Sequence, residues 1–281
     1  MRKYSIAITA MCGAAGIWAS PALAQSSSGF ALSADQTITG ANVANATVTV
    51  GPISPTSCSG PNCTDSAAAA NLNTTVALTS GLLGTSEQLQ ARALSSDSMT
   101  TPTEATATAT ILDLSAGIGL TATTPFINSL FGLSATTITS TSTANAGGLT
   151  GSTLIEGLTL TGSAFTPEFL AAFDASLFLS PDPNTILFSL GGLTIILNEQ
   201  LFSGDSITTN AIHVMFDDFA VGTGLKSGDL IFASTTASFP GAAAGAVPEP
   251  STWAMMLLGF GVAGTAIRRS RRKDSKLLQL A

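Results

Sequence analysis

The sequence predicts a mainly β protein, in the form of a β-sandwich or barrel-like domain with one or two short helices. Its polar residues are mostly Ser, Thr and Asn, which favour strands and turns over helix interiors. Short alternating or apolar runs are broken by Gly, Pro, Asn and Asp. Charged residues make up only 10% of the 281 residues and hydrophobic residues 45%, which is typical of a chain that packs a core.

The N-terminus has the three zones of a secretory signal peptide. Arg2 and Lys3 are basic, residues 6–18 are apolar but short for a bilayer, and Ala22 and Ala24 form a small-x-small cleavage pattern. We therefore expect residues 1–24 to be removed after Ala24 by the secretion machinery. An anchor helix is the disfavoured alternative.

The body, residues 25–240, is predicted to contain about ten strands. These are residues 37–50, 73–79, 103–114, 118–124, 135–143, 152–163, 185–190, 193–198, 206–217 and 229–238. Residues 105–110 alternate Ala and Thr, so their threonines should share one face. Gly191 and Gly192 between two apolar runs indicate a hairpin. A β-helix is the alternative architecture, but no fixed repeat period supports it.

Two segments of the body are predicted to be helical instead. Residues 80–94 are one of them. Residues 166–178 are the other, because Thr166 can cap a helix and Pro167 suits its first turn.

Two of the three cysteines lie in the body, with four residues between them. Cys58 and Cys63 flank Gly-Pro-Asn, which favours a turn. In an oxidising compartment this spacing predicts a small-loop disulfide. Zinc would need two more ligands, and the only histidine is distant in sequence.

The C-terminus combines a proline motif, an uncharged apolar run and a basic cluster. After a Gly/Ala linker over residues 241–247, the run over residues 251–267 would form a helix about 25 Å long, close to the thickness of a bilayer core. Residues 268–273 are basic and should stay cytoplasmic. The motif residues are Pro248, Glu249, Pro250, Trp253, Ala254, Arg268, Arg269, Arg271 and Arg272.

This order over residues 248–273 resembles the PEP-CTERM sorting signal, in its Pro-Glu-Pro-x-x-Trp-Ala form. The resemblance implies a Gram-negative source, recognition by an exosortase, processing near Pro248, and transfer to the cell envelope or surface. The same tail has been labelled an ice-binding protein C-terminal domain, a label that proves no activity. The short tail over residues 274–281 departs from the pattern, and a plain tail anchor is the alternative.

Short motifs of the body resemble the choice-of-anchor P family, whose members share an exported β-rich body and end in differing anchors. They lie at residues 57–63, 197–200, 209–214 and 228–234. That family's biochemical function is unknown, so the resemblance implies an architecture and no activity.

Charge excludes one class of partner. Between residues 26 and 247 only Arg92 and Lys226 are basic, against fifteen Asp and Glu, so this part carries 2 − 15 = −13. Nucleic acid binding needs a basic patch to neutralise phosphates, and this body has none.

The inventory of chemical groups disfavours catalysis. No Gly-x-Ser-x-Gly motif is present. His213 is the only histidine, so a secreted hydrolase would have to combine it with Asp217 or Asp218. Adjacent residues on a strand point to opposite faces, which makes these two aspartates a poor pair. With Asp205 and Asp229 they could bind calcium in a calcium-dependent adhesin, but no calcium-loop motif supports this.

Binding to sugar or to ice is also disfavoured. The body has no Trp on which a sugar could stack, and its threonines show no ladder repeated over many turns. No cofactor motif is present. The sequence thus predicts a non-enzymatic exported envelope protein. Its predicted partners are an exosortase, membrane lipid through residues 251–267 and exopolysaccharide.

Overall fold

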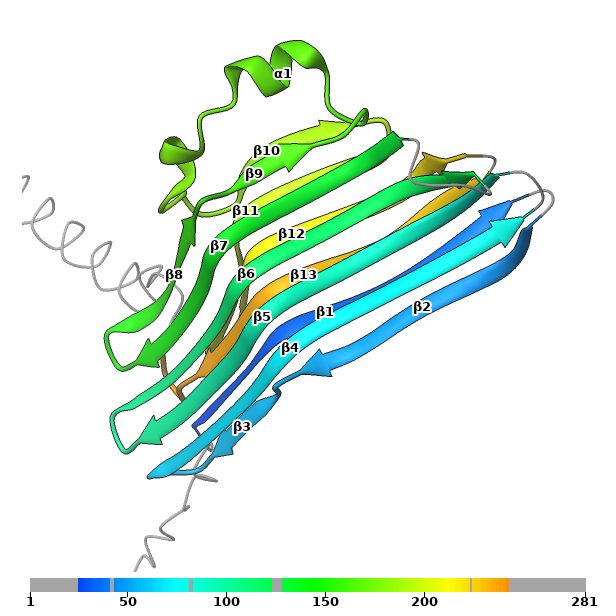
Figure 1. Cartoon of the computed structure of the whole chain (residues 1–281). Coiled ribbons are helices and arrows are strands. Elements are labelled where there is room, and N and C mark those ends of the chain that lie inside the picture. The colour runs from blue at the N-terminus through cyan, green and yellow to red at the C-terminus, as the bar shows by residue number, and fades with distance from the viewer. Residues whose placement is uncertain (1–24, 41–42, 81–82, 123–127, 223, 243–281) are drawn as a thin grey trace, which may run out of the picture.

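The chain folds into two antiparallel sheets that stack face to face (Figure 1). The computed structural model describes residues 25–40, 43–80, 83–122, 128–222 and 224–242. Sheet A has the order β10 (Thr185–Leu190), β11 (Leu193–Ser203), β12 (Ser206–Val221), β13 (Gly224–Ser238), β1 (Ser26–Gly40) and β2 (Val43–Ile53), with β3 (Thr56–Ser59) also paired to β1. Sheet B has the order β4 (Cys63–Ser80), β5 (Leu83–Thr101), β6 (Glu104–Ala122), β7 (Asn128–Asn145) and β8 (Gly148–Glu156), with β9 (Thr159–Thr161) also paired to β7.

The predicted β-sandwich is confirmed, whereas the barrel-like and β-helix alternatives are wrong. Among the described residues neither sheet closes on itself: sheet A ends at β10 and β2, and sheet B ends at β4 and β8. Most neighbouring strands are joined by short turns, as in Gly191 and Gly192 between β10 and β11, where both residues have positive φ (61° and 81°). That is the geometry of a tight hairpin turn.

The helix predicted over residues 80–94 is wrong, because these residues belong largely to the long strand β5. Leu89, Ala91 and Leu94 are all buried. These buried residues are spaced by two and then by three positions. A spacing of three also occurs along one face of a helix, but here it marks a bend in a strand. The strands predicted over residues 103–114 and 118–124 are likewise one strand, β6.

The helix predicted over residues 166–178 is confirmed only in part. Thr166 caps α1 (Pro167–Ala172) by accepting a hydrogen bond from the backbone N–H of Phe169 at 3.2 Å. The chain becomes extended at Phe173, and Asp174 then caps the separate 3₁₀ helix η1 (Ala175–Phe178). Figure 1 shows α1 beside the edge of the sandwich at which β9 and β10 lie.

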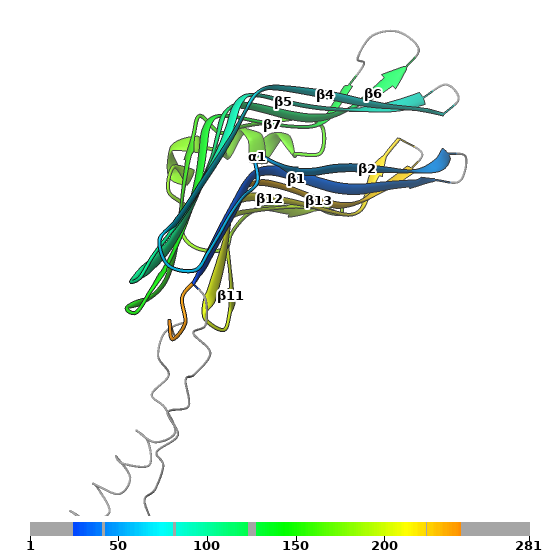
Figure 2. The same cartoon turned by 90° about the horizontal axis from the view of Figure 1, so that it is seen from below.

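Both sheets bend along a line that crosses the strands at mid-length (Figure 2). In sheet B the line passes through Asn71 (φ 56°), Asp113 (φ 52°) and Gly157 (φ 63°), on alternate strands or just beyond their ends. In sheet A the line passes through Asn198 (φ 50°) and Ala233 (φ 52°). A left-handed residue kinks the strand in which it lies, so alternate strands contain the kinked residues and their neighbours bend with them.

The bend also changes which residues face the interior. Successive inward side chains are two residues apart along most of each strand, but three apart across the bend line. Buried pairs with this spacing are Ala91 and Leu94 in β5, Ile111 and Leu114 in β6, Ala135 and Ile138 in β7, and Phe232 and Thr235 in β13. The bend line therefore divides the interior into two halves.

The two halves have different interiors. One is packed by large apolar side chains, with Phe131, Phe165, Phe188 and Phe216 at ring-centroid distances of 4.9–6.1 Å from one another in successive contacts. The other is packed by small residues. Its members include Ala105, Ala107, Ala109, Ser96, Ser98, Ser140, Ser142, Thr209 and Thr235.

The small residues join the sheets by side-chain hydrogen bonds. The hydroxyl of Ser142 lies 2.9 Å from those of Thr209 and Thr235. Thr56 lies 3.0 Å from Ser96 and 2.7 Å from Ser98. Each of these buried hydroxyls has a partner in the opposite sheet, which removes the cost of burying it and fixes how the sheets sit together.

Candidate functional site

The single histidine lies between two carboxylates on the outer side of sheet A. His213 on β12 has its Nδ1 2.8 Å from Oε2 of Glu199 on β11 and its Nε2 3.1 Å from Oδ1 of Asp229 on β13. Asn210 donates a second hydrogen bond to Oε2 of Glu199 at 2.7 Å. The side chains of His213 and Glu199 are only 13% and 12% exposed. Three adjacent strands thus present one compact polar cluster.

This arrangement favours the charged imidazolium. Burial of the ring opposes the charge, but the hydrogen bonds and charges of Glu199 and then Asp229 outweigh it, so the pKa of His213 is raised. The hydrogen bond from His213 is the main reason that the pKa of Glu199 is lowered. In the imidazolium form both ring nitrogens donate to carboxylates, which leaves neither nitrogen to accept a proton from a hydroxyl nucleophile.

A shallow hollow adjoins the histidine on the same side of the sheet. Asp229 contributes to its wall, and the other lining residues are Ser189, Leu190, Gly191, Gly192, Thr194, Met215, Phe216, Asp217 and Gly228. Gly192 and Gly228 lie against neighbouring backbone, because a Cβ added at either would fall 2.3 or 2.1 Å from a backbone oxygen.

The two adjacent aspartates do not point to opposite faces as predicted. A β-bulge between Phe216 and Phe219 inserts an extra residue opposite β13, and Asp218 adopts φ 53° there. As a result Asp217 and Asp218 are both exposed. Asp218 accepts a hydrogen bond from Ser227 at 3.1 Å and does not contact His213.

The four aspartates considered for calcium are not brought together as one site. Asp205 lies at the turn between β11 and β12, where its carboxylate accepts a hydrogen bond from the backbone N–H of Gly241. Asp218 bonds Ser227 and Asp229 bonds His213. Within the described part of the chain, no group of three or more His, Cys, Asp or Glu side chains could hold a metal ion.

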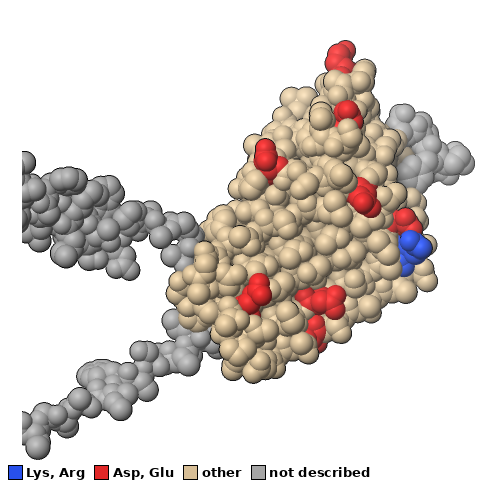
Figure 3. Space-filling view, turned by 90° about the vertical axis from the view of Figure 1, so that its left-hand side faces the viewer, with Lys and Arg blue, Asp and Glu red and all other residues tan. Residues whose placement is uncertain are grey.

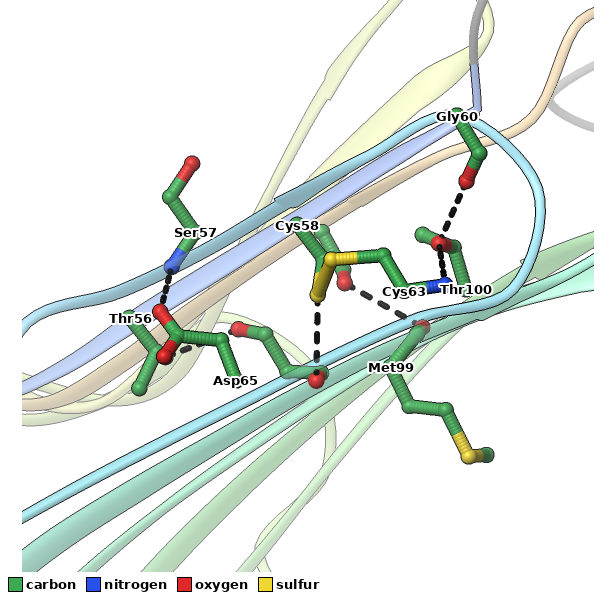
Figure 4. Close-up of a disulfide and its surroundings, with 10 residues drawn as sticks. Thr56, Ser57, Cys58, Gly60, Cys63, Asp65, Met99 and Thr100 are labelled. Atoms are coloured by element: carbon green, nitrogen blue, oxygen red, sulfur yellow. Dashed lines mark hydrogen bonds between the residues drawn. A yellow bond between two sulfur atoms is a disulfide. The ribbon is translucent and has the colours of Figure 1, made fainter.

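Cys58 and Cys63 form a disulfide where the chain passes from sheet A to sheet B (Figure 4). Cys58 is on β3 and Cys63 begins β4. The turn between them contains Asn62 with φ 61°. The backbone N–H of Cys63 donates to the hydroxyl of Thr100 at 3.2 Å, which ties the turn to β5.

The surface of the body carries few charges. Figure 3 shows acidic side chains distributed over one face, with the basic colour only at its edge. Of the two basic side chains in the described residues, Lys226 is buried and Arg92 pairs with Asp113. These side chains form no basic patch for a nucleic acid.

Comparison with known protein families decides the nature of the C-terminus. Residues 246–272 match the PEP-CTERM protein-sorting motif. The motif implies exosortase-dependent sorting of an exported protein to the cell envelope, with the exosortase as its partner. The match covers all nine motif residues from Pro248 to Arg272. It leaves the body unassigned.

The body finds no counterpart in the other comparisons. Neither the curated proteins nor the solved structures contain a match to the chain. The resemblance to the choice-of-anchor P family is not supported.

The predicted terminal segments lie outside the described residues. They comprise the signal peptide over residues 1–24 and the segments beyond residue 242, including the membrane helix over residues 251–267. Within the described ranges, no helix has the length and apolar character that crossing a membrane requires.

Proposed function

We propose that this chain is a non-enzymatic envelope protein, processed by an exosortase near Pro248 and held in the extracellular matrix through its β-sandwich. The observation that carries the proposal is the PEP-CTERM match at residues 246–272, which stands at the end of a β-rich, acidic body. In this proposal the apolar run over residues 251–267 holds the precursor in the inner membrane until the body is released from it.

A structural role for His213 supports the non-enzymatic part of the proposal. Hydrolysis by a serine nucleophile needs a histidine with one nitrogen free to accept the hydroxyl proton. Glu199 and Asp229 take both nitrogens of His213. Held as an imidazolium between these two carboxylates, His213 would offer the neighbouring hollow no general base.

The test is a pair of truncations expressed in an exosortase-containing host. Deleting residues 247–281 should release the body into the medium, because the whole recognised motif is lost. Deleting only residues 274–281, which lie beyond the match, should leave the protein in the envelope. Cell fractionation followed by intact-mass measurement would give the location and both processing sites.

Envelope location that is unchanged after the longer deletion would overturn the sorting proposal. An intact mass that still includes residues 251–281 would overturn the processing step alone. Release of the wild-type protein by mild removal of exopolysaccharide is the expected sign of matrix association.

A further inference from the structure

The outer face of sheet B carries a two-dimensional array of threonines. Three of them, Thr106, Thr108 and Thr110, alternate with buried alanines on β6. Four more alternate with buried residues on β7: Thr137, Thr139, Thr141 and Thr143. All seven point away from the interior. Six of them have buried sequence neighbours on both sides, and Thr137, at the bend line, has one buried neighbour, Ile138.

Strand pairing places these two columns in register. Thr106 is opposite Thr143, Thr108 is opposite Thr141, and Thr110 is opposite Thr139. The hydroxyls of Thr110 and Thr139 are 3.4 Å apart. On β8, Thr150 and Ser152 extend the rows beyond β7, opposite Thr143 and Thr141. We call these nine residues the threonine face.

The repeat of the threonine face is set by sheet geometry. Outward side chains recur about 6.8 Å apart along a strand and about 4.8 Å apart between strands. Each site repeats the same pair of groups, one methyl and one hydroxyl. The columns of β6 and β7 are adjacent, so only one interstrand twist step separates them.

The interior behind the threonine face makes it rigid. Ala105, Ala107 and Ala109 are completely buried beneath the β6 column. Ser140 and Ser142 lie beneath the β7 column, and both hydrogen-bond to Thr235 of sheet A at 2.9 Å. Small side chains held by intersheet hydrogen bonds leave the two strands little freedom to move.

The chemistry of the threonine face disfavours two other kinds of partner, an anionic polymer and a second protein. No basic side chain lies on it, so it does not suit an anionic polymer. None of its nine members is aromatic or a large aliphatic residue, so a second protein surface would gain little apolar burial on the array itself. The rows end at Met99 and Asp97 of β5, opposite Thr106 and Thr108, and at Leu154 of β8, opposite Thr139. An uncharged lattice of hydroxyls and methyls at a fixed repeat fits an ordered layer of water, and its two spacings are close to those between oxygens on the prism faces of hexagonal ice.

We propose that the threonine face is an ice-binding surface. Its hydroxyls would join the hydrogen-bond network of the first ice layer, and its methyl groups would occupy the spaces between water molecules. The sequence alone disfavours ice binding, because its threonines show no ladder repeated over many turns. The pairing of β6 with β7 brings them into one array. The proposal does not depend on the sorting route.

The test compares two threonine-to-tyrosine variants of the full-length chain in detergent, with a detergent-only blank. Thr141 lies at the centre of the array, between Thr108 and Ser152. Thr208 is the matched control: it too is a half-buried cross-strand threonine, 2.9 Å from Thr236, but on the outer side of sheet A. Wild type and Thr208→Tyr should inhibit ice recrystallisation and shape ice crystals, and Thr141→Tyr should lose both effects.

Melting curves establish that each variant is folded, and Thr108→Lys replaces Thr141→Tyr if the latter is not. A wild-type chain without effect on ice would overturn the proposal, as would a Thr141→Tyr variant that keeps the effect. Equal loss in Thr208→Tyr would also overturn it. Retention of wild type on an insoluble neutral glycan, without any effect on ice, would assign the face to polysaccharide instead.

Discussion

At the scale of residues, the informative group is a histidine that holds strands together. His213 bridges β11 and β13 from its position on β12, through hydrogen bonds to Glu199 and Asp229. The sequence identified His213 as the sole candidate base, but it could not show that both ring nitrogens have carboxylate partners. Those partners are 14 and 16 residues away and depend on strand register.

The raised pKa of His213 predicts a pH-dependent stability. Its contribution is fully present below pH 6.5 and is lost as the pH rises through the raised folded-state pKa. The lowered pKa of Glu199 contributes above pH 4.5 and is lost as the pH falls through its folded-state value. The cluster should therefore stabilise the fold most between pH 4.5 and 6.5.

Replacement of His213 by Gln should lower the free energy of unfolding by about 2 kcal/mol between pH 4.5 and 6.5. It should also remove the part of the stability loss that His213 causes as the pH rises. Urea unfolding across pH would measure both effects. Glu199→Gln should cost more than Asp229→Asn, because the Glu199 side chain is 12% exposed and that of Asp229 is 53% exposed. Equal costs, or an unchanged pH profile in His213→Gln, would contradict this account.

At the scale of elements, the bend line explains both the shape of the sheets and the errors in predicting them. A strand that crosses it presents inward residues with a spacing of two, then three, then two again. Strand prediction from alternation fails at such a point, and the segment wrongly predicted to be helical, residues 80–94, lies across it. Asn71, Asp113 and Asn198 are the available signal, since Asn and Asp tolerate the left-handed conformation and are otherwise rare within strands.

Gly157 offers a direct test of the bend line. It has φ 63°, and an added Cβ would lie 2.8 Å from the hydroxyl of Thr136. Gly157→Ala should therefore lower the free energy of unfolding by at least about 1–2 kcal/mol. Both the left-handed conformation of the alanine and its close contact with Thr136 contribute to this loss. The control is Gly51→Ala on β2, where no atom lies within 4 Å and which should be neutral or slightly stabilising. Equal melting temperatures for the two variants would refute the role of Gly157.

At the scale of the whole molecule, two kinds of interior hold the sheets together, and a buried ion pair adds to them. Lys226 of β13 reaches across to Glu87 of β5, with its Nζ 2.6 Å from Oε2 and 4.9 Å from the ring centroid of Phe216. The lysine side chain is fully buried and that of Glu87 is 11% exposed. Burial lowers the pKa of Lys226, opposed by the charge of Glu87. The pair connects the two sheets in the half with large apolar side chains.

Removing one partner of this pair should be far worse than removing both. Lys226→Met alone leaves the Glu87 carboxylate in the interior and should cost about 3–5 kcal/mol, whereas Lys226→Met with Glu87→Met should recover most of that loss. Arg92→Met breaks the exposed pair with Asp113 (side chains 66% and 51% exposed) and should change stability by less than about 1 kcal/mol. Chemical denaturation of the wild type and these three variants measures this, and a double variant as unstable as Lys226→Met would contradict it.

Local sequence determined the class of the fold and the sorting of the protein. Strand composition and turn residues need no distant partner, so the β-rich body, the hairpin at Gly191 and the Thr166 cap were predictable. The sorting motif was also predictable from local sequence, because it is one continuous segment, residues 246–272.

Tertiary structure decided everything that depends on which strands are neighbours. It placed Glu199 and Asp229 on His213, Glu87 on Lys226, and the threonines of β6 beside those of β7. The physical reason is that a strand's alternation fixes which side chains share a face, while register and sheet order fix what each side chain meets across it.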